Sequence, residues 1–201
     1  MRLFPSVTFA EEIIISIVNN CGGINFNANY SVNDLFKLLI ENYQSLFLSR
    51  IELLLNQEDI SDSIKLRKLE DMLDYSNNAD AEMYLTWCKK NGKKAAEFVA
   101  HFIPLLKFVN EDTPQRWTDE ALELMDKYSE DSHVLNIIST KLFNGSVSIW
   151  RYQNNKNAYD LLSENSNDTI IRLWALQEAE RMEQHIEKET KSYELYEVWN
   201  K

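Results

Sequence analysis

The sequence contains few of the residues that make tight turns or covalent cross-links. Its 201 residues include only 4 glycines, 3 prolines and 2 cysteines. β-Sandwiches and β-barrels need many turns with special backbone angles, so the scarcity of glycine and proline argues against these folds. Two thiols do not make a disulfide framework, and we expect Cys21 and Cys88 to be reduced.

Long apolar runs are lacking as well. A membrane-spanning helix needs about 20 apolar residues, and the strongest run in this sequence, residues 13–18, is far shorter. Glu11 and Glu12 interrupt the first apolar region, which is not typical of a signal peptide. The sequence therefore predicts no membrane association and, by elimination, a cytoplasmic location.

The chain has fewer basic than acidic residues: 21 lysines and arginines against 32 aspartates and glutamates, which gives a net charge of −11. The imbalance is uneven: residues 111–201 contain 18 acidic and 10 basic residues, whereas residues 1–110 contain 14 and 11. Such a surface repels nucleic-acid phosphates and anionic lipids, and it favours a protein partner with a basic surface. Simple solubility would also account for the excess of acids.

Apolar residues recur at helical spacing along most of the chain, which predicts an all-α protein of eight to ten helices without strands. One expected helix spans 93–109 and is kinked or split at Pro104. Another opens at Thr113-Pro114, and the last runs from Asp168 to about Thr190, with residues 192–201 extending it. The length fits a single domain, 1–201, and the charge distribution suggests a sub-division into residues 1–110 and an acidic part, 111–201.

The most informative pattern is D-x-x-I-R-x-x-A, formed by Asp168, Ile171, Arg172 and Ala175. It resembles the second helix of a HEAT-type repeat, in which paired helices stack into a solenoid. The resemblance covers about residues 150–186. It implies that Asp168 caps the helix and that Arg172 reaches an acidic residue of an adjacent unit.

The same resemblance implies packing roles for several apolar residues, and it turns those of the second helix toward a neighbouring unit. The first helix of the unit would span about 148–164 and pack Leu161 and Leu162 inward, while Ile171, Leu173, Trp174 and Ala179 supply contacts from the second. Earlier helix pairs lack the pattern, so a compact irregular helical bundle is the alternative to an α-solenoid. More loosely, residues 132–190 resemble the C-terminal helical region of large bacterial multidomain proteins, including some defence ATPases, although no ATPase motif is present.

Patterns for reaction chemistry are missing. The three histidines, His101, His133 and His185, are far apart, whereas a metal site needs three or four converging ligands. No P-loop, G-x-G-x-x-G, G-x-S-x-G or H-E-x-x-H motif occurs. The basic cluster Lys89–Lys94 either holds an anion or offsets a helix C-terminus. The sequence therefore predicts no catalytic residue, cofactor or metal.

The leading prediction is a non-enzymatic helical protein–protein interaction module, either a scaffold or the sensor region of a larger protein. The alternative is an acidic inhibitor, such as an immunity or anti-defence protein that blocks a basic partner. An enzyme whose residues converge only in three dimensions is a third and weaker interpretation. The oligomeric state stays open.

The predicted partner surface lies on the final helix and the acidic tail. Charge would come from Glu180, Glu183 and Glu187, and apolar anchors from Tyr193, Tyr196 and Trp199. The three aromatic residues recur at i, i+3 and i+6, so they either dock on the rest of the domain or contact the partner.

Overall fold

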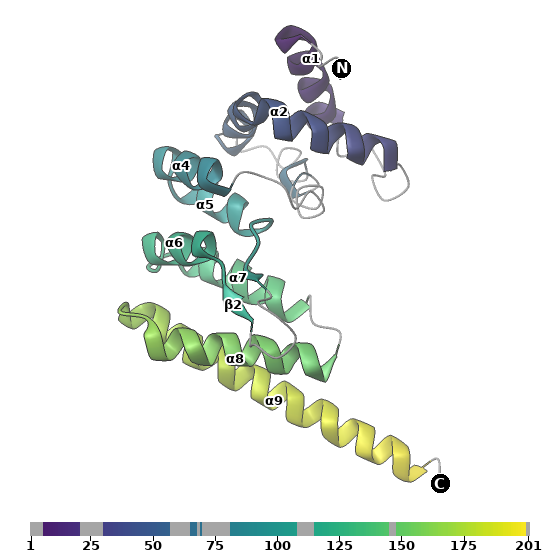
Figure 1. The fold of residues 1–201 in the computed structure, drawn as a ribbon, viewed down its shortest axis with the longest axis vertical. Helices are drawn as coiled ribbons and strands as arrows, with labels where there is room; N and C mark the ends of the chain where they lie inside the picture. Colours follow the sequence, from purple (N-terminus) through teal and green to yellow (C-terminus); the bar gives the residue numbers. More distant parts are fainter. Residues whose placement is uncertain are drawn as a thin grey trace. The chain divides into compact units, whose positions relative to one another are not determined.

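Helices make up nearly all of the regular structure in the part of the chain that the structure describes (Figure 1). The computed structural model describes residues 6–20, 30–56, 65–67, 69, 81–107, 115–144 and 148–199. Their packing divides the chain into a first unit, Met1–Ile103, and a second unit, Pro104–Lys201. The all-α prediction is confirmed, and no described helix has both the length and the apolar character needed to cross a bilayer.

The first unit begins with two helices that cross and pack together, α1 (Val7–Asn20) and α2 (Tyr30–Leu55) (Figure 1). One face of α1 is buried through Ala10, Ile14, Ile17 and Val18, at the spacing expected of an amphipathic helix. The α2 helix is kinked at Tyr43, where φ is −135° and ψ is 36°.

The other two helices described in full in this unit are α4 (Ala81–Asn91) and α5 (Lys93–Ala100). Gly92 separates them with φ 76° and ψ −154°, a conformation that side-chain-bearing residues avoid. Aromatic side chains hold this pair together, since Phe102 lies 4.8 Å from Tyr84 and 5.3 Å from Phe98 in edge-to-face contacts between ring centroids.

The chain leaves the helical conformation well before the end predicted for the 93–109 helix. The α5 helix ends at Ala100, and Pro104 precedes a short strand, β1 (Leu106–Lys107), that pairs antiparallel with β2 (Arg116–Trp117). Pro104 has no N–H to donate, and it disfavours helical angles in the residue before it. The prediction of a strand-free chain is therefore wrong at this two-residue pairing.

The next helix, α6 (Asp119–Lys127), starts later than the sequence suggested. Thr113 and Pro114 lie outside the described residues, but Gln115 is not helical and residues 116–117 form β2. The Thr118 hydroxyl oxygen accepts from the Ala121 N–H at 3.1 Å and donates to the Pro104 carbonyl at 2.6 Å. This residue fixes both the helix start and the loop before β1.

Three longer helices complete the second unit: α7 (Ser132–Asn144), α8 (Ile149–Asn165) and α9 (Thr169–Trp199). Antiparallel packing of α8 and α9 is the most extensive contact between elements of this unit (Figure 1). Tyr159 is fully buried at its centre, with ring centroids 5.4 Å from both Trp117 and Trp174. These aromatic contacts tie β2 to the helix pair.

Candidate functional site

The start of α9 is fixed by Asp168. Its carboxylate accepts from the N–H groups of Ile170 at 2.7 Å and Ile171 at 3.2 Å, so the predicted helix cap is confirmed. A hydrogen bond from the Ser129 side chain, together with these backbone N–H groups, holds the pKa of Asp168 below its ordinary value of 3.8. The carboxylate therefore stays ionised where it stabilises the first turn of α9.

The repeat resemblance also implies inward packing of Leu161 and Leu162 and an ion pair of Arg172, and the structure shows these only in part. Leu162 is buried, but Leu161 is 36 % exposed, so the inward packing expected of both residues is wrong for Leu161. Arg172 is exposed and has no ionic partner among the described residues, so the implied bridge to an acidic residue is not formed there. Ala175 is fully buried.

The most unusual surface is the solvent-exposed side of α9, opposite its buried residues. Ile170, Leu173 and Leu176 are 43 %, 56 % and 52 % exposed, whereas Ile171 and Met182 on the opposite side are buried. Residues three apart lie on adjacent turns of one helix face, so the three exposed side chains form a continuous apolar row. Leu173, from which the repeat resemblance expects an apolar contact, is exposed in this unit.

Acidic residues continue this face toward the C-terminal half of the helix. Glu180, Glu183 and Glu187 are all exposed, and we name the six residues Ile170, Leu173, Leu176, Glu180, Glu183 and Glu187 the outward face of α9. The face is less charged than the sequence suggests, because Glu183 lies 3.0 Å from the Lys156 ammonium and Glu187 lies 3.9 Å from that of Lys191.

The two lysine pairs leave Glu180 as the carboxylate of this face that has no cationic partner among the described residues. It accepts a hydrogen bond from Gln184 at 3.4 Å. Lys156 also hydrogen-bonds to Asp160, and hydrogen bonds to Asp160 and Glu183 raise the pKa of its ammonium. The uncompensated charge of the outward face is therefore concentrated at Glu180.

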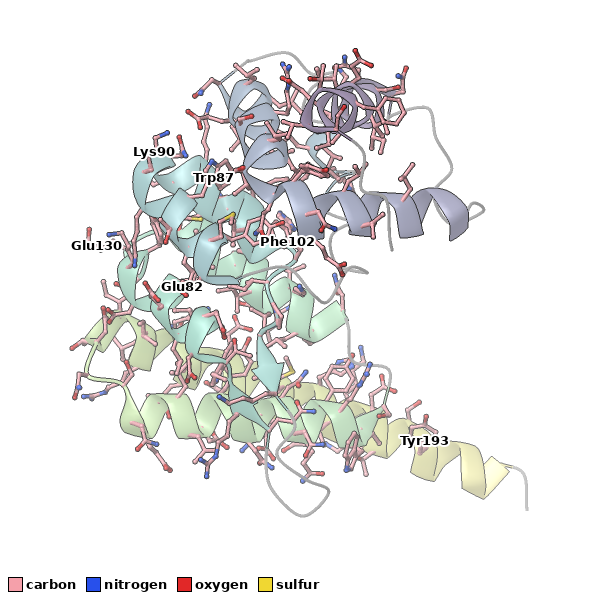
Figure 2. All side chains as sticks on the ribbon, turned by 45° about the horizontal axis from the view of Figure 1, so that its top comes forward. Glu82, Trp87, Lys90, Phe102, Glu130 and Tyr193 are labelled. Atoms are coloured by element: carbon pink, nitrogen blue, oxygen red, sulfur yellow. The ribbon has the colours of Figure 1, made fainter. Side chains whose placement is uncertain are left out.

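The C-terminal part of α9 continues past the N-terminal end of α8 (Figure 1). The His185 ring packs against Tyr152 near the start of α8, with centroids 4.3 Å apart, and its Nε2 lies 3.8 Å from Glu189. Tyr193 stands on the extending segment and is 62 % exposed, so it does not dock on the unit (Figure 2). The side chains of Tyr196 and Trp199 lie outside the described residues.

A pocket of about 810 Å³ lies elsewhere in the second unit, between β2, α6 and the corner that joins α8 to α9. Its floor is apolar and buried, formed by Trp117, Met125, Leu162 and Ile171. Nothing in the sequence pointed to this pocket, because its residues come from separate elements whose meeting depends on the tertiary fold.

The described residues offer neither a metal centre nor a reactive thiol. They contain no group of three His, Cys, Asp or Glu side chains that could hold a metal ion. Burial raises the pKa of the Cys88 thiol to about 12, which leaves it un-ionised and poorly nucleophilic at neutral pH. Cys21 lies outside the described part of the chain.

Comparison with known proteins gives no family to which the site could be related. No protein-family model, curated protein or solved structure matches the chain.

Proposed function

We propose that the chain is a non-enzymatic helical protein-interaction module and that the outward face of α9 contacts its partner. The observation that carries this proposal is the exposed row of Ile170, Leu173 and Leu176 on a helix whose other side is already buried. A single exposed leucine is ordinary, but adjacent aliphatic side chains on successive turns are typical of interaction sites.

The chemistry of the outward face favours a protein as the partner. Its aliphatic row supplies apolar area that must be desolvated to give affinity, and Glu180 next to it attracts a basic residue. The solenoid interpretation supports the same use, because a HEAT-like helix pair turns apolar residues of its second helix toward a neighbour. That neighbour is a further part of a larger protein or a separate chain.

An acidic inhibitor is the second candidate function, and Glu180 together with the acidic composition of residues 111–201 favours it. Such an inhibitor uses the same face but depends more on charge. The two functions differ in the effect on the partner: an inhibitor abolishes the activity of a basic protein stoichiometrically, whereas a scaffold leaves that activity in place.

Site-specific crosslinking tests the proposal. A photoreactive amino acid would replace Leu173 or Leu176 in the full chain, and Leu53 of the first unit, which is also 52 % exposed, is the matched control position. We expect the two α9 positions to capture the same protein in the source cells and Leu53 not to capture it. Equal capture at Leu53 would remove the support for a contact on α9.

Kinetics with the captured partner give the second readout. Leu173→Ser should raise the dissociation rate about tenfold, since it removes buried apolar area from the contact. Glu180→Lys should mainly slow association, and more so at low salt, because exposed charges act on the encounter and are screened by ions. Unchanged rates in both variants would move the interface away from α9.

A further inference from the structure

The pocket of the second unit is a surface separate from the outward face of α9. It shares no residue with that face, since Ile171, its contribution from α9, belongs to the buried side of the helix. A volume of about 810 Å³ lies within the range of about 300–1,000 Å³ that is usual for ligand sites.

The floor of the pocket is held in place before anything binds. Trp117 is 6 % exposed, and its indole N–H donates to the Ala158 carbonyl at 2.9 Å. Met125 is fully buried and Leu162 is 7 % exposed. An apolar floor fixed by packing offers affinity without the entropic cost of ordering a loop.

Charge is distributed unevenly around the rim. The α6 helix contributes Asp119, Glu123 and Asp126, which lie at i, i+4 and i+7 and so share one side of the helix. Lys107 lies 3.5 Å from the exposed Asp119, a pair of little energetic weight, and β2 contributes Arg116. The pocket is therefore acidic along α6 and basic along β2.

We propose that this pocket binds a segment of a protein partner that places a large apolar side chain on the floor and a Lys or Arg side chain against α6. Leu122 and Leu161 line the pocket while being 38 % and 36 % exposed, so the apolar surface continues outward onto the edge. That continuity suits an extended polypeptide better than an enclosed small molecule. The guanidinium of Arg116 is then available to a backbone carbonyl or a carboxylate of the segment.

Four labelled heptapeptides test the proposal on the full chain. They carry Phe or Ala at the central position and Lys or Glu on both sides of it, and binding is followed by fluorescence anisotropy. We expect saturable binding of the Phe/Lys peptide, about tenfold weaker binding when Phe becomes Ala, and none with Glu flanks. The Ala/Lys peptide measures the general attraction of a basic peptide to an acidic protein.

NMR chemical shifts of the methionine methyl groups locate the bound peptide. Met125 lies in the pocket floor, whereas Met83 belongs to the first unit and Met182 to the buried side of α9. The Phe/Lys peptide should shift the Met125 signal and leave those of Met83 and Met182 in place. A Met125 signal that does not move during saturable binding overturns the assignment.

Two pocket variants have matched controls in the first unit. Leu161→Ser and Asp126→Lys alter exposed positions of the pocket, and Leu53→Ser and Glu82→Lys make comparable changes at exposed positions outside both proposed sites. The pocket variants should weaken the Phe/Lys peptide about tenfold and the controls should not, with circular dichroism confirming that all four remain folded.

Failure of the Phe/Lys peptide to bind, a lack of preference for Phe over Ala, or equal weakening by the controls overturns the pocket proposal. These outcomes leave the α9 contact untouched, because that contact is judged by crosslinking at Leu173 and by kinetics with a protein partner.

Discussion

Trp174 links three elements of the second unit through one indole ring. Its centroid lies 5.4 Å from that of Tyr159 on α8 and 6.3 Å from that of Trp117 on β2. Its N–H donates to the Ser139 hydroxyl of α7 at 3.2 Å. The ring is only half-buried.

Substitutions at Trp174 should separate packing from hydrogen bonding. We expect Trp174→Ala to lower the free energy of unfolding by about 3 kcal/mol, the lower end for a large aromatic, because the side chain is only half-buried. Trp174→Phe keeps most of the ring contacts and loses one hydrogen bond, so we expect the free energy of unfolding to fall by about 1 kcal/mol. Urea denaturation measures both values. A loss below about 1 kcal/mol for the alanine variant would contradict a packing role.

Cys88 should report the opening of the first unit. Burial raises the pKa of its thiol to about 12, so neither ionisation nor access favours reaction at neutral pH. In a Cys21→Ser background, labelling of Cys88 by a thiol reagent should therefore be negligible in buffer and rise with denaturant together with the loss of helical circular dichroism. Rapid labelling of the folded chain would show that the site is accessible.

Among the helices, α9 depends on a cap whose charge is linked to pH. The folded pKa of Asp168 is lowered below the ordinary value of 3.8, so its ionisation stabilises the fold above that value, and this contribution is lost as pH falls through the folded pKa. Asp168→Asn keeps a capping oxygen without the charge, whereas Asp168→Ala removes both.

Thermal unfolding of these two variants tests the linkage. At neutral pH, Asp168→Ala should lower the unfolding midpoint more than Asp168→Asn does. The difference in midpoint between the wild type and Asp168→Asn should start to shrink below about pH 4, where the carboxyl of the unfolded chain becomes protonated, and disappear as pH falls through the lower folded pKa. A difference that is independent of pH would show that the charge of Asp168 does not contribute.

The sequence predicted best those elements whose signals are local. Asp168 lies directly before α9 and accepts from the Ile171 N–H. Ser148 lies directly before α8, and its hydroxyl oxygen accepts from the Arg151 N–H in the first turn of that helix. Both helices therefore start close to where they were expected. The start of α6 was missed because Thr118 takes its conformation partly from the Pro104 carbonyl, 14 residues earlier. A contact of this kind has no local periodic signal.

Which side of α9 is buried could not be read from α9 alone. Ile170, Ile171, Leu173 and Trp174 place apolar side chains around much of the helix, so periodicity did not single out one face. The position of α8 decides that Ile171 is buried while Ile170 and Leu173 are exposed. The outward face and the pocket therefore emerge only when the helices are packed.

Across the whole molecule, charge is divided unequally between the two units. Residues 1–103 carry 14 acidic and 10 basic residues, and residues 104–201 carry 18 and 11, for net charges of −4 and −7. The dense basic cluster lies in the first unit. Lys89 and Lys90 occupy the last turn of α4, where they offset the helix dipole, and Figure 2 labels Lys90. The Lys94 ammonium donates to the Leu55 carbonyl at 3.2 Å.

These charges predict that the protein does not bind nucleic acid tightly. Four lysines, Lys89, Lys90, Lys93 and Lys94, would release few counterions from a duplex, and both units carry an excess of negative charge that opposes the phosphates. Titration of a labelled random duplex should therefore show no binding tighter than about 10⁻⁴ M at physiological salt. Sub-micromolar binding that weakens with salt would contradict this expectation. Loss of that binding in Lys90→Glu, but not in Lys188→Glu on α9, would then assign the contact to the α4–α5 junction and reverse the preference for a basic protein partner.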